Sequence, residues 1–318
     1  MSEFNLIKRY FTWNSRSPNI VKGVGDDAAV INISNDKSLV TSVDTSIAGV
    51  HFPMGTPAFD VGHKSLAVNL SDIAAMGATP KWFTLALSLP SIDKPENTEW
   101  LEGFSQGLKQ QAEQSGCDLI GGDTTQGNLS ITIQIMGVVD KGTALLRSGA
   151  SVGDLIYVTG TLGDAAVGLA TIINGLEMES LADVDYCQKR LNTPTARILE
   201  GQFIKQFATS CIDISDGFLQ DLGHILKVSQ VGACINTQKI PLSNALSRMN
   251  KSVAIQAALS GGDDYELLFT IPKSSNAAFL KIASFKTSCV GEINTSLNTI
   301  TDEKGDLLNV AGYNHFNV

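Results

Sequence analysis

Residues 129–139, LSITIQIMGVV, alternate apolar and polar side chains along most of their length. The apolar members of the alternation are Leu129, Ile131, Ile133 and Ile135, and the polar members are Ser130, Thr132 and Gln134. A period of two residues puts each set on its own face of a β-strand, so the stretch predicts a strand with one face in a core. Residues 39–52 and 83–89 carry similar strand signals.

Helical patterns lie between these strands, at about 60–77 and 96–115. In the first pattern, apolar or small residues recur with the helical period and can pack on a sheet. These residues are Leu66, Leu70, Ile73 and Gly77. Asp72 falls on a neighbouring strip of the same helix, so its carboxylate can face a cleft. The N-terminal part of the chain is therefore predicted to be a domain of mixed strands and helices.

A second domain is predicted to begin near the polar, glycine-bearing stretch at 147–154, which reads as a linker. There, a strand at 155–160 leads into a helix from Asp164, and a strand at 211–215 leads into a helix from about Phe218. We therefore expect an α/β (α+β) protein of two domains, 1–143 and 144–318.

The composition fits a globular protein and disfavours several functions. The chain has 318 residues, 43% of them hydrophobic and 17% charged, with a net charge of −9. A protein this acidic is not expected to bind nucleic acid, which needs a basic surface. No apolar run is long enough to span a bilayer. Five scattered cysteines without a C-x-x-C pair predict a reducing compartment, the cytoplasm.

Aspartates recur where predicted strands end and helices start. They lie at 24–27, 42–46, 69–78, 120–125, 213–217 and 260–267. Each motif alone is also typical of a turn or a helix cap; Asp216 and Asp164, for example, can cap the helices that follow them. Six such motifs in both halves exceed what turns require. Carboxylates without His or Cys clusters favour a hard cation, and magnesium first where phosphate is bound.

Other phosphate and catalytic motifs are missing from the sequence. It has no G-x-x-x-x-G-K-[ST] loop and no G-x-S-x-G turn. The stretch TGTLGD at 159–164 follows a predicted strand but lacks the dinucleotide-binding spacing. The four histidines have no zinc spacing.

Taken in order, the motifs resemble those of the thiamine-monophosphate kinase family over almost the whole chain. The stretches that carry the resemblance are GVGDDAA, SVDTSIAGVHF, KSLAVNLSDIAAMGATP, LIGGDTT, RSGA, GDLIYVTGTLGD, IDISDGFLQDLGHI, LSGGDDYELLFT and GYNHF. The wider superfamily includes aminoimidazole ribonucleotide synthetase, selenophosphate synthetase and a hydrogenase maturation factor. The resemblance implies an N-terminal mixed sheet that forms a barrel with a second copy in a homodimer. It also implies a C-terminal sheet packed with helices, and ATP in the cleft between the domains.

The resemblance further implies which residues bind ligands. Its magnesium ligands fall on Asp27, Ser42, Val43, Asp44, Asp72, Asp123, Asp213 and Asp216. Its ATP contacts fall on Gly121, Gly122, Asp123, Arg147 and Ser215, and its thiamine phosphate contacts on His51, Asp263 and Tyr313. Val43 stands where a hydroxyl residue is common, which implies a contact through the backbone carbonyl. Asp263 stands where glutamate is usual and reaches one methylene less far.

The implied reaction is in-line transfer from ATP to thiamine phosphate, which gives thiamine diphosphate and ADP with the help of several Mg²⁺ ions. Because the attacking phosphate oxygen is already an anion, no general base is required. Cations also explain the adjacent carboxylates of Asp26 and Asp27.

Two alternatives to this function stay open. One is another ATP-dependent synthetase of the superfamily, such as an aminoimidazole ribonucleotide- or selenophosphate-synthetase-like enzyme, and the other is a non-catalytic nucleotide-binding module. The first cysteine, Cys117, lies far from the N-terminal segment in which selenophosphate synthetase carries its reactive residue.

Overall fold

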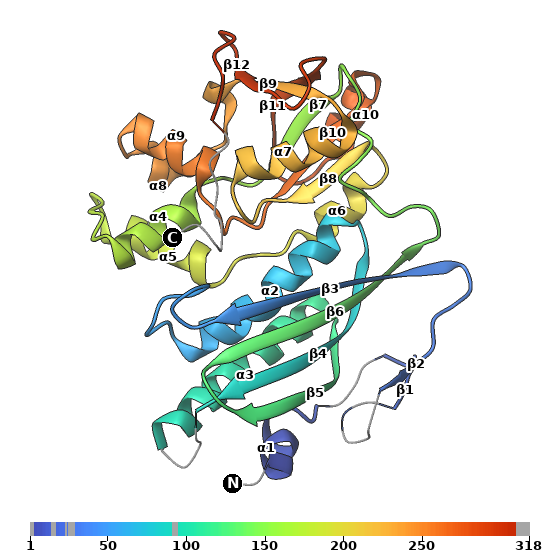
Figure 1. Cartoon of the computed structure of the whole chain (residues 1–318), viewed down its shortest axis with the longest axis vertical. Coiled ribbons are helices and arrows are strands. Elements are labelled where there is room, and N and C mark those ends of the chain that lie inside the picture. Colours follow the sequence, from blue (N-terminus) through green and yellow to red (C-terminus); the bar gives the residue numbers. More distant parts are fainter. Residues whose placement is uncertain (1–2, 14–16, 23, 25–28, 91–94, 310–318) are drawn as a thin grey trace. The chain divides into compact units, whose positions relative to one another are not determined.

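A computed structural model describes residues 3–13, 17–22, 24, 29–90 and 95–309. The chain divides into two compact units, shown in Figure 1 and described here one at a time. Unit 1 holds Met1–Ile73 and Ala78–Thr143, and unit 2 holds Ala74–Gly77 and Ala144–Val318.

Unit 1 is built on a four-stranded sheet in the order β3-β6-β4-β5. Its elements in chain order are α1 (Glu3–Tyr10), β1 (Ile20–Lys22), β2 (Val30–Ile31), β3 (Lys37–Ile47), α2 (Ala58–Ala75), β4 (Thr79–Leu89), α3 (Pro95–Ser115), β5 (Asp118–Gln126) and β6 (Ser130–Asp140). β6 pairs antiparallel with β3 and β4, whereas β5 pairs parallel with β4. The sheet is therefore mixed, as predicted.

The predicted alternation in β6 is confirmed, because Ile131, Ile133 and Ile135 are buried while Gln134 is exposed. The strand predicted at 39–52 is shorter than expected: β3 ends at Ile47, and a turn through Gly49 (φ +78°) follows. Gly77 likewise lies outside α2, which ends at Ala75; its φ of +63° belongs to the turn after the helix. Both glycines terminate elements because they accept the left-handed backbone at little cost.

The helices α2 and α3 cross at unusually short range in unit 1. A Cβ atom at Gly107 of α3 would lie 1.9 Å from the backbone oxygen of Phe59. A Cβ atom at Gly62 of α2 would lie 2.1 Å from the backbone oxygen of Phe104. Figure 1 shows both helices on one side of the sheet. The two glycines therefore allow the helix backbones to touch.

Unit 2 is built on a six-stranded sheet in the order β12-β9-β11-β7-β10-β8, antiparallel except for the β12–β9 pair. Its strands are β7 (Leu155–Thr159), β8 (Ser210–Asp213), β9 (Gly232–Ile235), β10 (Leu267–Ile271), β11 (Thr287–Asn294) and β12 (Ile300–Asp302). Its helices are α4 (Asp164–Ile173), α5 (Leu181–Asn192), α6 (Ile198–Ile204), α7 (Phe218–Ser229), α8 (Asn244–Ser247), α9 (Lys251–Ser260) and α10 (Asn276–Ile282), with short 3₁₀ turns at Thr237–Lys239 and Lys273–Ser275.

Hydrophobic cores pack against both faces of this sheet. One core holds Phe218 and Leu222 of α7 against Ile156 of β7. The other core holds the rings of Phe279 and Phe269, whose centroids lie 5.7 Å apart. The last turn of α2 joins this second core: Ala74 and Ala75 are buried in it, and Leu145 donates its backbone N–H to Met76 at 3.0 Å.

We predict that Gly107→Ala lowers the free energy of unfolding by about 1–3 kcal/mol, because the new methyl group forces the two helices apart. The substitution would otherwise favour a helix, so a loss cannot come from helix propensity. Urea unfolding measures the change. Gln106→Ala, at an exposed neighbouring position of α3, is the control and should stay within about 0.5 kcal/mol of the original protein. An unchanged midpoint for Gly107→Ala would contradict the close helix contact.

Candidate active site

Two predicted metal ligands of unit 1 meet at the edge of its sheet. Asp44 on β3 lies against Asp72 on α2, and the two carboxyl groups interact by charge and by a hydrogen bond. Ser42 donates its Oγ hydrogen to Asp72 Oδ2 at 2.5 Å. Residues 42 and 44 share a face of β3 because alternate side chains of a strand point the same way. The structure thus brings together Ser42, Asp44 and Asp72, all half-buried.

Burial and the neighbouring charge of Asp72 raise the pKa of Asp44 to about 6. Both causes act in the same direction, because each makes the ionised carboxylate less favourable. At neutral pH the pair is therefore a site of concentrated negative charge. Such a pair of oxygen donors suits a hard divalent cation.

Asp123 lies elsewhere in unit 1. It belongs to β5 at the opposite edge of the sheet, about three interstrand spacings or about 14 Å from β3. Asp123 pairs with exposed Ala86, whereas Asp44 is in line with buried Ile133 and Leu85. Asp123 consequently occupies the other face of the sheet, as does Val43, whose side chain is 60% exposed. Within unit 1 the structure does not bring Asp123 next to Asp44.

The glycines before Asp123 are not equivalent. A Cβ atom at Gly122 would lie 1.9 Å from the backbone oxygen of Leu85, so β4 and β5 can pair there only with glycine. At Gly121 the nearest atom would be a methyl carbon of Thr84 at an ordinary 3.8 Å. The sheet therefore requires Gly122 for packing, and only Gly121 has room for a side chain.

Of the other predicted site residues that the structure describes, His51 belongs to unit 1 and Arg147 to unit 2. His51 follows β3, and its Nδ1 accepts the backbone N–H of Ile47 at 3.0 Å, which orients the ring. Arg147 lies in an exposed segment before β7. Asp27 and Tyr313 lie outside the described residues.

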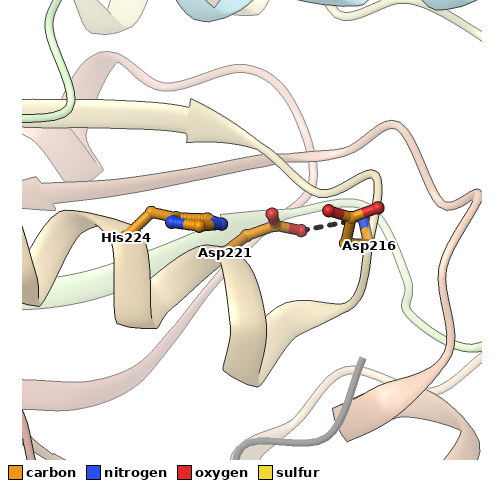
Figure 2. Close-up of side chains that lie close together, drawn as sticks. All are labelled: Asp216, Asp221 and His224. Atoms are coloured by element: carbon orange, nitrogen blue, oxygen red, sulfur yellow. Dashed lines mark hydrogen bonds between the residues drawn. The ribbon is translucent and has the colours of Figure 1, made fainter. Parts of the chain in front are cut away.

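In unit 2 the predicted ligands follow β8. Asp213 is buried at the end of this strand, and Ser215 and Asp216 form the turn that leads into α7. The turn is held by Asp221, which sits in the first helical turn. Its Oδ2 accepts the backbone N–H groups of Ser215, Asp216 and Gly217 at 3.1, 3.2 and 3.2 Å. Figure 2 shows the bond from Asp216 to Asp221.

Asp221 was not predicted as a site residue. It is buried, and burial together with the charge of Asp216 raises its pKa to about 7, although the three N–H groups act in the other direction. Ligand atoms of Asp216, Asp221 and His224 lie within 4.8 Å of one another, a grouping able to hold a metal ion (Figure 2). Because three N–H groups already occupy Asp221 Oδ2, its evident role is to shape the turn that carries Ser215 and Asp216.

The alternative that Asp216 and Asp164 serve as helix caps is wrong. The N-cap residues of α7 and α4 are Gly217 and Gly163, so neither aspartate occupies the N-cap position. Asp164 is instead the first residue of α4, where its carboxylate accepts hydrogen bonds from Thr161 at 2.6 Å and Ser243 at 2.5 Å.

The predicted substrate residue Asp263 lies beside the same turn. Its backbone N–H donates to the backbone oxygen of Ser215 at 2.8 Å, and Tyr265 donates likewise to Ile214 at 2.8 Å. The segments 213–217 and 261–266 are therefore adjacent in unit 2. The structure brings Asp213, Ser215, Asp216 and Asp263 together in this unit.

Comparison with known families matches both halves of the chain. Residues 25–139 match the model of "AIR synthase related protein, N-terminal domain", and residues 151–296 match that of "AIR synthase related protein, C-terminal domain". The chain thus has the two-domain fold of an AIR synthase related protein.

Full-length relatives narrow this class. A protein of Escherichia coli K12 named thiamine-monophosphate kinase is 46% identical over 99% of this chain and 98% of its own. The solved structure of thiamine-monophosphate kinase from Stenotrophomonas maltophilia K279a superimposes with a TM-score of 0.85 at 42% identity, covering 92% of this chain and 93% of that one. The chain belongs to the thiamine-monophosphate kinase family, which confirms the resemblance inferred from its motifs.

A third relative has been solved with ligands. "AaThiL complexed with AMPPCP and TMP" superimposes with a TM-score of 0.79 at 31% identity, covering 93% of this chain and 92% of that one. Separately, none of the helices in the described part of this chain has the length and apolar character needed to cross a membrane.

We predict that Asp44→Asn stabilises the metal-free protein near neutral pH. Since the folded-state pKa of Asp44 is raised to about 6, folding is favoured by its protonated form, and that stability is lost as pH rises from about 4 through about 6. The uncharged amide avoids the loss, so the gain in unfolding free energy should be about 1–2 kcal/mol at pH 7.5 and smaller at pH 4.5.

Thermal or urea unfolding in EDTA at both pH values measures this gain. Asp185→Asn, at an exposed position of α5, is the control and should change neither curve. A destabilised Asp44→Asn at pH 7.5 would contradict the account of the carboxylate pair.

Proposed function

We infer that the protein is an ATP-dependent kinase that converts thiamine phosphate to thiamine diphosphate. The observation that carries this inference is the 46% identity, over almost the whole of both chains, with a thiamine-monophosphate kinase. The complex of AaThiL with AMPPCP, an unreactive analogue of ATP, and TMP supports the pair of substrates. The carboxylates of Asp44 and Asp72 in unit 1, and of Asp213 and Asp216 in unit 2, are oxygen donors that suit the metal ions needed for a reaction between two phosphates.

The main difficulty of this reaction is charge. The attacking group is a phosphate oxygen, which is already an anion at neutral pH, so no side chain has to remove a proton from it. The protein itself carries a net charge of −9. The task of the site is therefore to bind and orient two anions against an acidic background, rather than to activate a nucleophile.

We propose that Asp44 and Asp72 in unit 1, and Asp213 and Asp216 in unit 2, hold magnesium ions. The donor set fits: the oxygens are hard ligands, and burial together with the charge of Asp72 raises the pKa of Asp44, a penalty that a shared cation would offset. When bound, the ions neutralise phosphate oxygens and stabilise charge in the transition state. Ser42, Val43, Asp27 and Asp123 stay proposed as further ligands.

We propose that the remaining predicted site residues orient the reactants. Ser42 fixes one oxygen of Asp72 by its 2.5 Å hydrogen bond. The residues proposed to bind ATP are Gly121, Gly122, Arg147 and Ser215. The backbone N–H of Ser215 is held by its hydrogen bond to the Asp221 carboxylate. His51, Asp263 and Tyr313 are proposed to bind thiamine phosphate.

We predict that Asp72→Asn lowers kcat at least about 100-fold, since removing one preorganised electrostatic contact of a transition state typically costs that much. Incubation with ATP, Mg²⁺ and thiamine phosphate, followed by chromatography of thiamine diphosphate and ADP, measures the rate. The exposed Asp140 of the same sheet provides the matched control, Asp140→Asn, which should keep full activity. If the unaltered protein binds ATP but forms no thiamine diphosphate, the kinase assignment is wrong and a binding module is favoured.

We also propose that the protein is a homodimer that joins through the sheet of unit 1. The face of β3 opposite Asp44 carries exposed apolar side chains: Leu39 at 44%, Val43 at 60% and Ile47 at 41% exposure. Asp123 belongs to the same face. A second copy seated there would bury this apolar surface, which water otherwise contacts.

Light scattering tests the dimer. We predict twice the chain mass of 33.8 kDa for the unaltered protein and the single mass for Leu39→Asp, because the new charge opposes burial. Val228→Asp, at a 53% exposed position of α7 in unit 2, is the control and should remain dimeric. A single chain mass for the unaltered protein would overturn the proposed dimer.

A cytoplasmic location is part of the same proposal. All five cysteines are free thiols, as is typical of proteins in a reducing compartment.

A further inference from the structure

The segment between α9 and β10, residues 261–266, contains strained backbone. Asp263 has a φ of +68° and Tyr265 a φ of +50°, in the left-handed region that side-chain-bearing residues rarely adopt. For a residue as bulky as tyrosine this conformation is an outlier. Strain of this kind persists only where the surrounding structure fixes it, and it concentrates at functional sites.

Two buried acidic residues alternate with the strained ones and fix the segment. Both carboxylate oxygens of Asp264 accept the backbone N–H of Gly163, at 3.0 and 2.8 Å. The carboxylate of Glu266 accepts two hydrogen bonds from Arg197, from Nε and Nη2, each at 2.6 Å. It accepts another from Nη2 of Arg190 at 3.0 Å. Asp264 and Glu266 are both 1% exposed. The segment is therefore anchored from within unit 2.

The alternation places Asp263 and Tyr265 on the less buried side. There the phenol of Tyr265 donates a hydrogen bond to Asp263 Oδ1 at 2.8 Å. An ionised acceptor makes such a bond stronger than one between neutral groups. The phenol thus fixes the position of Asp263 Oδ1. Because a carboxylate is planar, this also limits the direction in which Oδ2 points.

We propose that Tyr265 is a positioning residue that fixes the Asp263 carboxylate for binding the cationic, amine-bearing thiamine part of the substrate. This proposal rests on the proposed function and on the proposed contact of Asp263 with thiamine phosphate. A short aspartate side chain has little reach with which to correct a wrong orientation, so a fixed carboxylate matters more here than it would for glutamate. Tyr265 acts through Asp263 and has no part in the transfer step.

Tyr265→Phe tests the proposal because it removes one hydroxyl group and keeps the ring. We expect KM for thiamine phosphate to rise about 5- to 20-fold, with kcat, KM for ATP and Tm nearly unchanged. Tyr157→Phe is the matched control: it also removes one hydroxyl-to-oxygen bond within unit 2, from Tyr157 to Asn276 at 2.6 Å, but away from Asp263 in the fold. Its KM values should stay as they are.

A double substitution separates positioning from a direct contact. In an Asp263→Ala background, where the orienting bond has no acceptor, adding Tyr265→Phe should raise KM for thiamine phosphate no further. An equal rise in both backgrounds would overturn the proposal, since Tyr265 would then act independently of Asp263. So would an unchanged KM in the single Tyr265→Phe variant, or equal rises in KM for ATP and thiamine phosphate.

The kinase assignment has its own separate outcome. If the unaltered protein forms no thiamine diphosphate, the proposed function fails and takes this inference with it. If the unaltered protein is active but Tyr265→Phe behaves as the original, only the inference about Tyr265 fails.

Discussion

The repulsion between carboxylates that the fold holds together is the constraint on which this protein's chemistry depends. Asp44 and Asp72 come from a strand and a helix of unit 1, and burial together with the charge of Asp72 raises the pKa of Asp44. Asp221 and Asp216 come close in the same way in unit 2. Holding two like charges close together lowers the stability of the fold. Bound cations and ligands of opposite charge offset this loss.

In each unit, local hydrogen-bond donors partly compensate for this loss of stability. In unit 1, Ser42 donates to Asp72. In unit 2, three backbone N–H groups converge on Asp221, and the buried Asp264 and Glu266 are each satisfied by donors of their own. These bonds orient the acidic side chains without a ligand, and a site that is already oriented loses less conformational entropy when it binds.

Much of the fold was predictable because side-chain periodicity is a local property. The alternation of β6 and the helical patterns of α2 and α3 were visible in the sequence. The strand β5 was not identified, because LIGGDTT looks like a turn; only its pairing with β4 holds Gly121 and Gly122 in an extended strand. The candidate site was less predictable. Nothing local reveals that Asp44 meets Asp72 or that Asp221 anchors a turn, since an acidic residue in a first helical turn is common.

The passage of the chain through both units has a consequence for dissecting the protein. Ala74–Gly77 belong to unit 2 although their neighbours in sequence belong to unit 1. The backbone oxygen of Ala74 lies so near Gly201 that a Cβ there would approach it to 2.1 Å. If the gene were divided after codon 143, the C-terminal fragment would lack Ala74 and Ala75, and the apolar side chains that they cover would be exposed. The N-terminal fragment would keep Ala74–Gly77 without the core into which they pack. Producing the halves as separate polypeptides calls for grafting that segment onto the second one.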